Sequence, residues 1–413
     1  MRQSLQLALS IVLTWTGIQA GGQSFMHLTS SDGLPDNHVR FVYQDSSGYI
    51  YAGTRNGMCR YDGYVFSTAV CRDTMQPPPR EFAAMIQTRH GFFTVAATGI
   101  YAYDRKNNSL HLQKKLQLLD EACFTEFNGT IFCGNSAGLF AYDTISGKWN
   151  ESNQYVAGIN QIHVRSMVVT TSAELLIGTN RGLFRYDRNM QLVESRTGTN
   201  PYYHDINGLV QDSGGNTWIS TFNNVYGYDS LYNGIGDFRE VFTDQHIRCT
   251  ALDQSQRIWV GGEFGIVILD PVAGQHTTVY RDIGREQGLN DNAIYSLYRD
   301  ASDNIWVGTY FGGINLWNAD FDKFSIIFPG EGDKNTSGKV VREMLEDKSG
   351  NLWLALEDGG LNYLNTTSGT VTRFFYQGDN EYKNIHSLIL EDNLLWLGSF
   401  NQGLECYRIG FTG

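Results

Sequence analysis

The sequence predicts an all-β protein built as a β-propeller, and three observations carry that prediction. A short aromatic phrase recurs with spacings of 41, 47, 47 and 43 residues between its tryptophans. A repeat of about 40 to 50 residues made of short apolar runs is typical of propeller blades. Alternating apolar and polar residues next to turn residues favour antiparallel strands, and no stretch keeps a helical period. The tryptophans are Trp218, Trp259, Trp306, Trp353 and Trp396.

Each repeat is expected to hold an apolar strand, an Asp/Ser/Gly/Asn turn, an aromatic strand, a Gly-containing loop and a third strand ending in Tyr-Asp or a similar pair. One blade cannot bury its own faces, so neighbouring sheets must stack around an axis. The residue that opens the third strand recurs roughly every 43 residues, in the range of propeller repeats. These residues are Gly57, Gly99, Gly138, Gly182, Asn224, Gly265, Gly313, Gly360 and Gly403.

Nine repeats exceed the four to eight blades typical of one ring. The best linker in the chain is the segment Pro329–Asp333, and seven repeats precede it. We therefore predict a seven-bladed propeller over residues 21–328 and the first two blades of a second, truncated propeller over residues 329–413. The apolar segment 24–28 is left over at the start and is expected to supply an outer strand that closes the seventh blade.

The amino-acid composition limits the classes of function and structure that the chain can have. The net charge of −12 argues against a nucleic-acid partner, because such partners select basic faces. The chain has 45 Gly and only 7 Pro, which suits tight turns between strands better than a disordered linker.

The first twenty residues are expected to be a signal peptide. Arg2 precedes an apolar run from Leu5 to Trp15, and Ile18-Gln19-Ala20 has the small-residue pattern of a cleavage site. No later run reaches the roughly 18 apolar residues that a membrane helix needs. The sequence thus predicts a periplasmic location.

No metal, cofactor or catalytic residue is predicted. The six cysteines form no CxxC pair, and the nine histidines form no HExxH motif and are not expected to recur in register. Cys123 and Cys133 flank the turn Asn128-Gly129 and could be either a disulfide or two buried thiols. The Gly-x-Ser-x-Gly pattern around Ser136 aligns with an ordinary loop between the second and third strands, so it does not indicate a hydrolase.

The candidate ligand contacts are residues of the loop after the second strand. These loops gather on one rim of a propeller near its axis, and variable loops on a rigid scaffold are where recognition is expected. Sugars suit such a surface, since their hydroxyls bond to Arg, Asn and Glu while an aromatic ring covers an apolar face. The candidates are Arg55, Asn56, Asn180, Arg181, Glu263, Phe264, Tyr310, Phe311 and Glu357.

Several phrases resemble the regulator-propeller repeat of Bacteroidetes hybrid two-component sensors. They include Asp32-Gly-Leu-Pro-Asp-Asn-His-Val39, Gly53-Thr-Arg-Asn-Gly57, Gly288-Leu-Asn-Asp-Asn-Ala-Ile294 and the segments Val340–Trp353 and Asn384–Leu388. The resemblance extends over residues 24–409. It implies a periplasmic region with two seven-bladed propellers and a β-sandwich, followed in full-length members by a membrane helix and a histidine kinase.

The resemblance also implies a function, namely detection of an oligosaccharide and signalling to a histidine kinase that this chain does not contain. Contact with the membrane would come only through downstream segments, and a homodimer would be compatible with the full-length protein. The alternatives are a propeller that serves as an interaction scaffold and, ranked below it, a propeller glycosidase or lyase.

Overall fold

The computed structural model describes residues 17–18, 24–72, 78–116, 121–152, 162–197, 205–243, 245–283, 287–318, 327, 329–375 and 384–409. This part of the chain is all β, with two short 3-10 turns, η1 (Ser30–Asp32) and η4 (Arg239–Phe242), and no α-helix. The all-β propeller prediction is confirmed. The chain divides into two compact units, residues 1–323 and 324–413. The boundary predicted at residues 328 and 329 stays a prediction, because residues 319–326 and 328 lie outside the described residues.

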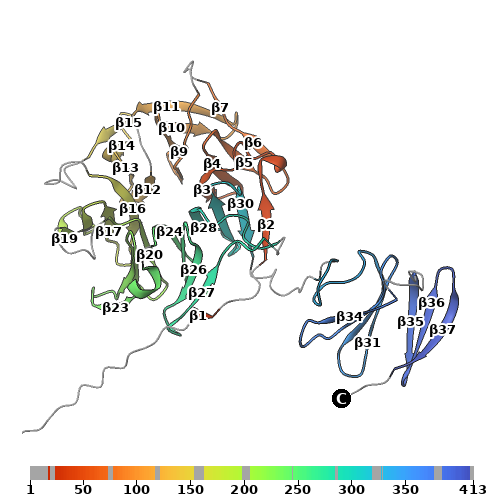
Figure 1. Ribbon diagram of the computed structural model, residues 1–413. Coiled ribbons are helices and arrows are strands. Elements are labelled where there is room, and N and C mark those ends of the chain that lie inside the picture. The colour runs from red at the N-terminus through yellow and green to blue at the C-terminus, as the bar shows by residue number, and fades with distance from the viewer. Residues whose placement is uncertain are drawn as a thin grey trace, which may run out of the picture. The chain divides into compact units, whose positions relative to one another are not determined.

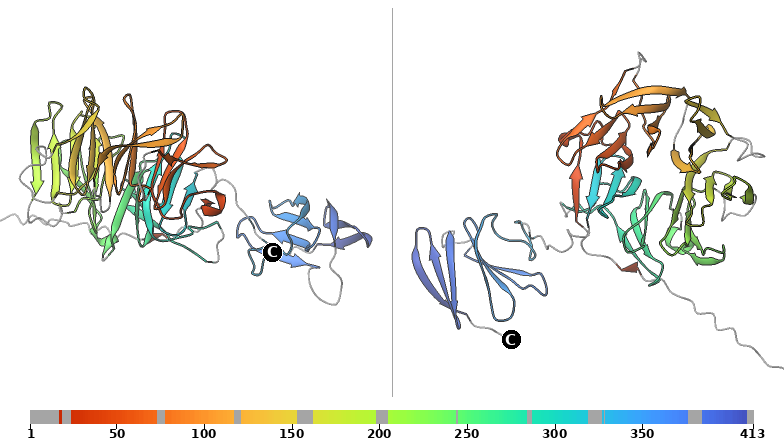
Figure 2. Two further views of the ribbon diagram at one scale, coloured as in Figure 1. Left: turned by 90° about the horizontal axis from the view of Figure 1, so that it is seen from above. Right: turned by 180° about the vertical axis from the view of Figure 1, so that it is seen from behind.

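Among the described residues of the first unit, seven mainly antiparallel sheets surround one axis (Figure 1). Figure 2 shows the same ring from two other directions. The strands of the first sheet are β3 (Val39–Gln44), β4 (Ile50–Thr54), β5 (Gly57–Tyr61) and β6 (Phe66–Thr68). Those of the second are β8 (Ala84–Thr88), β9 (Gly91–Ala96), β10 (Gly99–Asp104) and β11 (Ser109–Lys115), with β7 (Val70–Cys71) added in parallel to β11.

The next three sheets repeat this order. The third consists of β12 (Ala122–Phe127), β13 (Thr130–Asn135), β14 (Gly138–Asp143) and β15 (Lys148–Glu151). The fourth consists of β16 (Val164–Val169), β17 (Leu175–Thr179), β18 (Gly182–Tyr186) and β19 (Leu192–Thr197). The fifth consists of β20 (Gly208–Gln211), β21 (Thr217–Ser220), β22 (Val225–Tyr228) and β23 (Gly234–Asp237).

The sixth sheet consists of β24 (Ile247–Leu252), β25 (Ile258–Gly262), β26 (Gly265–Asp270) and β27 (Gln275–Val279). A two-residue strand β1 (Gly17–Ile18) pairs in parallel with β27. The rest of the predicted signal peptide, residues 1–16 and 19–20, lies outside the described residues.

The seventh sheet closes the ring with the start of the chain. Its strands β28 (Ile294–Arg299), β29 (Ile305–Thr309) and β30 (Ile314–Trp317) are followed by β2 (Phe25–Leu28), which pairs antiparallel to β30. The predicted closing strand is therefore confirmed. The innermost strands β28 and β3 lie next to each other, so the last sheet meets the first.

The repeated tryptophan packs between sheets, as predicted. Trp218, Trp259 and Trp306 are 3%, 0% and 4% exposed. Each indole N–H donates to the Asp that opens the preceding turn, over 3.0 Å to Asp212, 3.0 Å to Asp253 and 2.8 Å to Asp300. The same carboxylates accept backbone N–H groups within their turns. One Asp carboxylate thus accepts hydrogen bonds from both the backbone of the turn and the buried indole, which explains why the turn aspartate and the tryptophan recur together.

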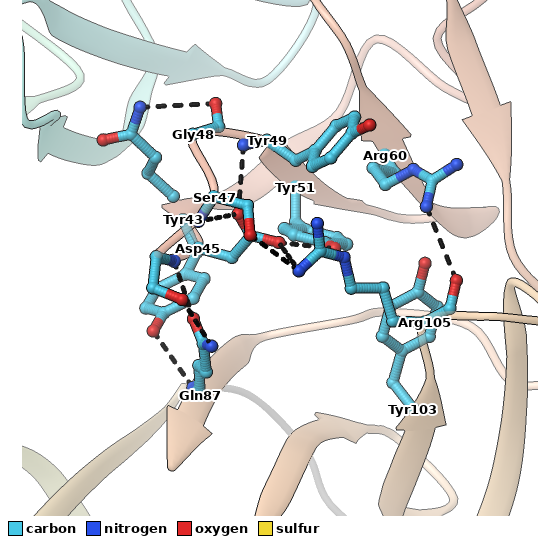
Figure 3. A network of polar contacts seen from close by, with 12 residues as sticks. Tyr43, Asp45, Ser47, Gly48, Tyr49, Tyr51, Arg60, Gln87, Tyr103 and Arg105 are labelled. Atoms are coloured by element: carbon cyan, nitrogen blue, oxygen red, sulfur yellow. Dashed lines mark hydrogen bonds and ion pairs between the residues drawn. The ribbon is translucent and has the colours of Figure 1, made fainter. Parts of the chain in front are cut away.

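In the first sheet a tyrosine replaces the tryptophan, and the turn is linked to the second sheet (Figure 3). The Tyr51 hydroxyl donates to Asp45 over 3.1 Å, and the Arg105 guanidinium lies 3.5 Å from the same carboxylate. Arg60 and Arg105 lie over the ring of Tyr49, at 4.9 and 5.0 Å from its centroid. Because Arg105 belongs to the second sheet, the network fastens adjacent blades on the face opposite the cavity described below.

Glutamine side chains join other blades on that face. In each case the side-chain oxygen of a glutamine accepts a backbone N–H from the turn between the first and second strands of the preceding blade. The pairs are Gln44 with Ala301 at 2.8 Å, Gln87 with Ser46 at 2.7 Å and Gln211 with Thr171 at 2.6 Å. Side-chain bonds of this kind contribute about 1 kcal/mol each. They add directional contacts to the apolar packing between sheets.

The second unit contains two sheets in the described residues. The first is β31 (Val341–Glu346), β32 (Leu352–Leu356), β33 (Gly360–Leu364) and β34 (Val371–Phe374), and the second is β35 (Ile385–Glu391), β36 (Leu394–Ser399) and β37 (Gly403–Arg408). Trp353 is buried against the second sheet, whereas Trp396 is only half-buried.

Cys123 and Cys133 are free thiols in the structure, which is the second of the two alternatives. Burial raises the pKa of the Cys133 thiol to about 12, so it stays protonated at neutral pH. These cysteines act as small core residues.

Candidate functional site

A cavity of about 710 Å³ opens on the axis of the first unit, within the size range of ligand sites. It lies at the ends where the inner strands begin and the second strands finish. All seven sheets contribute to its wall. The lining residues are His38, Arg40, Arg55, Glu81, Ala83, Ala96, Ala97, Glu121, Ala122, Ser136, His163, Arg165, Asp205, Asn207, Phe222, His246, Arg248, Tyr295 and Tyr310.

Four of these side chains occupy β-bulges at the start of an inner strand. In β3 the pairing passes from Val39–Thr54 to Phe41–Gly53, so the strand register skips Arg40. The same shift occurs at the equivalent place in β16, β24 and β28. A bulge re-aims the extra residue and is often found next to functional sites. The other three bulge residues are Arg165, Arg248 and Tyr295.

Three histidines recur at the same position of the repeat, so the expectation that no histidine recurs in register is wrong. His38, His163 and His246 each stand two residues before a bulge arginine, with a fully buried Val or Ile between them. Since side chains alternate along a strand, the residues on both sides of that buried position face the axis. The phrase His-Val/Ile-Arg therefore delivers a histidine and an arginine to the cavity three times. No group of three metal-ligating side chains suited to a metal ion occurs among the described residues.

Arg40 and Arg55 share one carboxylate. The Arg40 Nη1 atom lies 3.1 Å from Glu81, and Arg55 Nε lies 3.3 Å from the other oxygen of the same group. The two arginines come from the first sheet and Glu81 precedes the second, so the pairs bridge adjacent blades.

Arg165 is held on three sides. Its guanidinium lies 2.9 Å from Asp205 and 3.6 Å from Glu121, and it donates to the Asn207 side-chain oxygen over 2.6 Å. Its three partners come from the sheets before and after its own. These contacts hold the guanidinium, the two carboxylates and the amide in place along this side of the cavity.

Two of the cavity carboxylates sit on unusual backbone. Glu81 and Asp205 adopt φ of 54° and 63°, the left-handed region that is uncommon for residues other than Gly. Such conformations cluster at functional sites, because the surrounding structure must hold them there.

Arg248 and its neighbours form an aromatic side. Its guanidinium pairs with Glu263 over 2.7 Å and lies over the ring of Tyr295, 4.4 Å from the centroid. The ring of His38 lies 4.9 Å from that of Tyr295 and 4.3 Å from that of Tyr310. A second platform is formed by His246, stacked on Phe222 at 4.2 Å. Besides Glu81 and Glu121, the second and third sheets contribute alanines and Ser136, whose small side chains leave space.

The side chain of His38 is buried without a hydrogen bond. It is 8% exposed, and neither ring nitrogen has a hydrogen-bond partner. Burial, and then the positive charge of Arg40, lowers its pKa below the ordinary 6.5, so the ring is neutral at pH 7. The charged groups that act on it are Arg40, Glu81, Asp36 and Arg55.

This lowered pKa predicts a pH dependence of stability. Below about pH 6.5 the unfolded chain binds a proton at His38 that the folded chain binds only at lower pH, so acidification lowers the free energy of unfolding. His38→Phe removes this loss and should give a shallower fall between about pH 7.5 and pH 5.5 in urea titrations. His246, whose pKa burial and Arg248 also lower, leaves a residual slope. Identical slopes in the two proteins would contradict the assignment.

Of the predicted contact residues, Arg55 and Tyr310 line the cavity. Glu263 reaches it through the pair with Arg248, and Phe311 is 73% exposed with its ring 4.5 Å from that of Tyr310. Phe264 instead packs on Phe242 of the core, 5.8 Å between centroids.

The remaining candidates are not among the residues that line the cavity. Asn56 bonds Asp36, and the Asn180 side-chain oxygen accepts the His163 N–H over 2.9 Å. Arg181 is exposed, and Glu357, in the second unit, pairs with Arg342 over 2.6 Å. Ligand contact by any of the nine residues stays a prediction. The bulge arginines and the histidines were missed, although the recurring His-Val/Ile-Arg phrase was a signal for them.

The family model "Two component regulator propeller" matches residues 33–56 and 288–311. These segments belong to the first and seventh sheets and carry His38, Arg40, Arg55, Tyr295 and Tyr310 of the cavity wall. The resemblance found in the sequence is therefore confirmed. No curated protein matches the chain by sequence.

Solved structures with the same architecture include the extracellular domains of two proteins from B. thetaiotaomicron. That of the hybrid two component system BT3049 is 17% identical with a TM-score of 0.64, over 94% of this chain and 59% of that one. That of the hybrid two component system BT4673 is 17% identical with a TM-score of 0.61, over 94% and 58%. This chain thus spans less than two thirds of either domain.

Virginiamycin B lyase from Staphylococcus aureus is also similar, at 12% identity and a TM-score of 0.55, over 72% of this chain and 99% of the lyase. At these identities the likeness concerns the fold. Within the described residues, no helix has the length and apolar character to cross a membrane.

Proposed function

We propose that this chain is the extracytoplasmic ligand-sensing region of a two-component regulatory system, and that it binds an oligosaccharide in the axial cavity. The observation that carries the proposal is the polar cavity of about 710 Å³, which all seven sheets build in a chain with regulator-propeller repeats. Its wall combines fixed donors and acceptors with aromatic rings. A periplasmic location, as predicted from the first twenty residues, fits this role.

The wall suits sugar chemistry. Arg, Asn, Asp and Glu present planar hydrogen-bonding groups that match neighbouring hydroxyls, and their pairs with one another hold them in place. The rings of Tyr295 and Tyr310 offer apolar faces beside these groups. Sites with mostly fixed walls and a few well-placed polar groups are typical of small-ligand binding.

Binding rather than catalysis is favoured by the ion pairs. The lining carboxylates Glu81, Glu121 and Asp205 all pair with arginines, so none is left open to act as a base or nucleophile in this arrangement. Signalling would follow if the ligand binds one arrangement of the sensor region more tightly than another. The shift in the equilibrium between the arrangements can be no larger than this difference in affinity.

The interaction-scaffold alternative predicts a large exposed apolar patch on one rim. The rim where the second-to-third-strand loops gather instead holds a polar cavity with a few aromatic rings. This observation favours a saccharide over a protein partner.

Isothermal titration against neutral and acidic oligosaccharides tests the proposal. Tyr310→Ala should weaken the binding of a saccharide that the wild type binds by about tenfold or more, as truncation of an aromatic anchor does. Phe400→Ala is the matched control, since Phe400 follows the second strand of the last sheet and is 74% exposed. It should leave the affinity unchanged. No heat with any saccharide would contradict the proposed function.

A further inference from the structure

Arg55 differs in exposure from the other three arginines of the axial cavity. Its side chain lines the cavity and is 57% exposed. The side chains of Arg40, Arg165 and Arg248 are only 12%, 22% and 19% exposed. Of the four guanidinium groups, that of Arg55 is therefore the most accessible to a ligand.

The guanidinium of Arg55 is also the one that the protein engages least. Its Nε atom lies 3.3 Å from Glu81, and within the described residues the Arg55 side chain donates no hydrogen bond. The other oxygen of Glu81 accepts a hydrogen bond from Arg40 over 3.1 Å. The two terminal nitrogens of Arg55 can thus donate to a ligand, and they form the planar fork that binds a carboxylate through two parallel hydrogen bonds.

Exchange of Glu81 for a ligand carboxylate should cost little. An ion pair between solvent-accessible side chains contributes little, because water screens it, and Glu81 is itself 33% exposed. Glu81 keeps its hydrogen bond from Arg40 when Arg55 turns to the ligand. Asp36, the other acidic residue at this end of the cavity, already accepts hydrogen bonds from Asn56 and from a backbone N–H.

The backbone of Arg55 is anchored on both sides. Its N–H donates to the His38 carbonyl over 3.0 Å, and its carbonyl accepts the Glu81 N–H over 2.9 Å. The ring of Tyr310, from the seventh sheet, packs on the ring of His38 at 4.3 Å. The buried His38 thus positions both the Arg55 backbone and the Tyr310 ring at the cavity wall, so Arg55 extends from a fixed place in the fold.

We infer that Arg55 binds the carboxylate of an acidic sugar residue, which makes the axial cavity selective for oligosaccharides that contain a uronic acid. This inference rests on the proposed function and names the ligand class within it. A uronic acid carries a planar carboxylate in addition to the hydroxyls of a neutral sugar. The guanidinium fork of Arg55 matches the carboxylate, while the Asn, Asp and Glu side chains of the wall suit the hydroxyls.

The test is isothermal titration of the whole chain with matched neutral and acidic trisaccharides. The pairs are galactotriose with trigalacturonate, cellotriose with triglucuronate and mannotriose with trimannuronate. We expect the acidic member of a pair to bind about tenfold or more tightly than its neutral partner, because a charged donor and a charged acceptor then meet. Its affinity should fall as salt rises from about 0.05 M to about 0.5 M, since the site is open to solvent.

Arg55→Gln should lower the affinity for the acidic ligand by about tenfold or more and remove most of the salt dependence. Arg55→Lys keeps the charge but loses the fork, so its affinity should lie between those of the wild type and Arg55→Gln. Arg188→Gln is the matched control, because Arg188 is exposed and follows β18 at the end of the fourth sheet that lies away from the cavity. It removes the same charge and should bind like the wild type.

The outcomes separate this inference from the proposed function. If a neutral member binds and its acidic partner binds no more tightly, the inference is overturned and the proposed function stands. The same holds if Arg55→Gln binds the acidic ligand as tightly as the wild type does. An equal loss in Arg188→Gln would assign the effect to net charge and would also overturn the inference. If the wild type binds no probe, neutral or acidic, the proposed function fails and the inference with it.

Discussion

Replacing both Phe25 and Leu28 with alanine is expected to leave the first unit unfolded or nearly so at room temperature. These are the two buried residues of the closing strand β2, 3% and 8% exposed. Phe25 packs with Trp259 between the sixth and seventh sheets, whereas Leu28 packs with Val39 between the seventh and first. The strand therefore supports two of the seven sheet interfaces at once.

The magnitude follows from ordinary core substitutions. A buried Phe→Ala costs about 3–5 kcal/mol and a buried Leu→Ala about 2–5 kcal/mol. Their sum approaches the roughly 5–15 kcal/mol by which most domains are stable. Because β2 belongs to the last sheet but comes from the start of the chain, the loss should also lower the cooperativity of unfolding.

Met26→Ala on the same strand is the control, because Met26 is 39% exposed, against 3% for Phe25 and 8% for Leu28. It should change the melting temperature little. Thermal denaturation followed by circular dichroism, with limited proteolysis of the native protein, compares the two variants. A double variant that melts within a few degrees of the wild type would show that β2 does not close the ring.

The fold could be predicted because its repeat is carried by residues with one physical role. The tryptophan and the turn aspartate recur together, since one carboxylate satisfies both the turn and the indole N–H. The closing strand was predictable from counting, because Phe25–Leu28 was the apolar segment without a repeat of its own.

The site could be predicted only in part. Arg55 and Tyr310 lie in loops whose position follows from the repeat, so their approach to the axis could be expected. Arg40, Arg165 and Arg248 lie within strands, where alternation alone does not show which residue forms a bulge. The bulge results from pairing between strands, which a single strand's sequence does not specify.

Trp353 shows another limit. It occupies the same phrase as Trp306, yet its indole nitrogen has no hydrogen-bond partner, and Asp347 accepts the hydroxyl of Tyr363 over 2.8 Å instead. A neighbouring tyrosine within the same sheet thus takes over the carboxylate. Which ring bonds the aspartate depends on tertiary packing that the repeat does not encode.

Trp306→Ala is expected to lower the free energy of unfolding of the first unit by roughly 3–5 kcal/mol, the usual cost of truncating a buried large aromatic residue. Trp306 is 4% exposed and belongs to the cluster between the seventh and first sheets, where its ring meets Tyr61 edge-on at 6.3 Å. The substitution creates a cavity at that interface and leaves Asp300 without its indole donor. Urea titration at pH 7 measures the change, with the m-value showing whether unfolding stays two-state.

Trp306→Phe separates the two parts of this effect. Phenylalanine keeps much of the apolar contact but cannot donate to Asp300, so its cost should be smaller than that of alanine and include about 1.5–3 kcal/mol for the lost hydrogen bond to a charged group. Asp300 also accepts the N–H groups of Ser302 and Asn304, so the turn itself should persist in both variants. If alanine and phenylalanine cost the same, the hydrogen bond would account for the whole effect. Packing between blades would then not be what preserves a large ring at this position of the repeat.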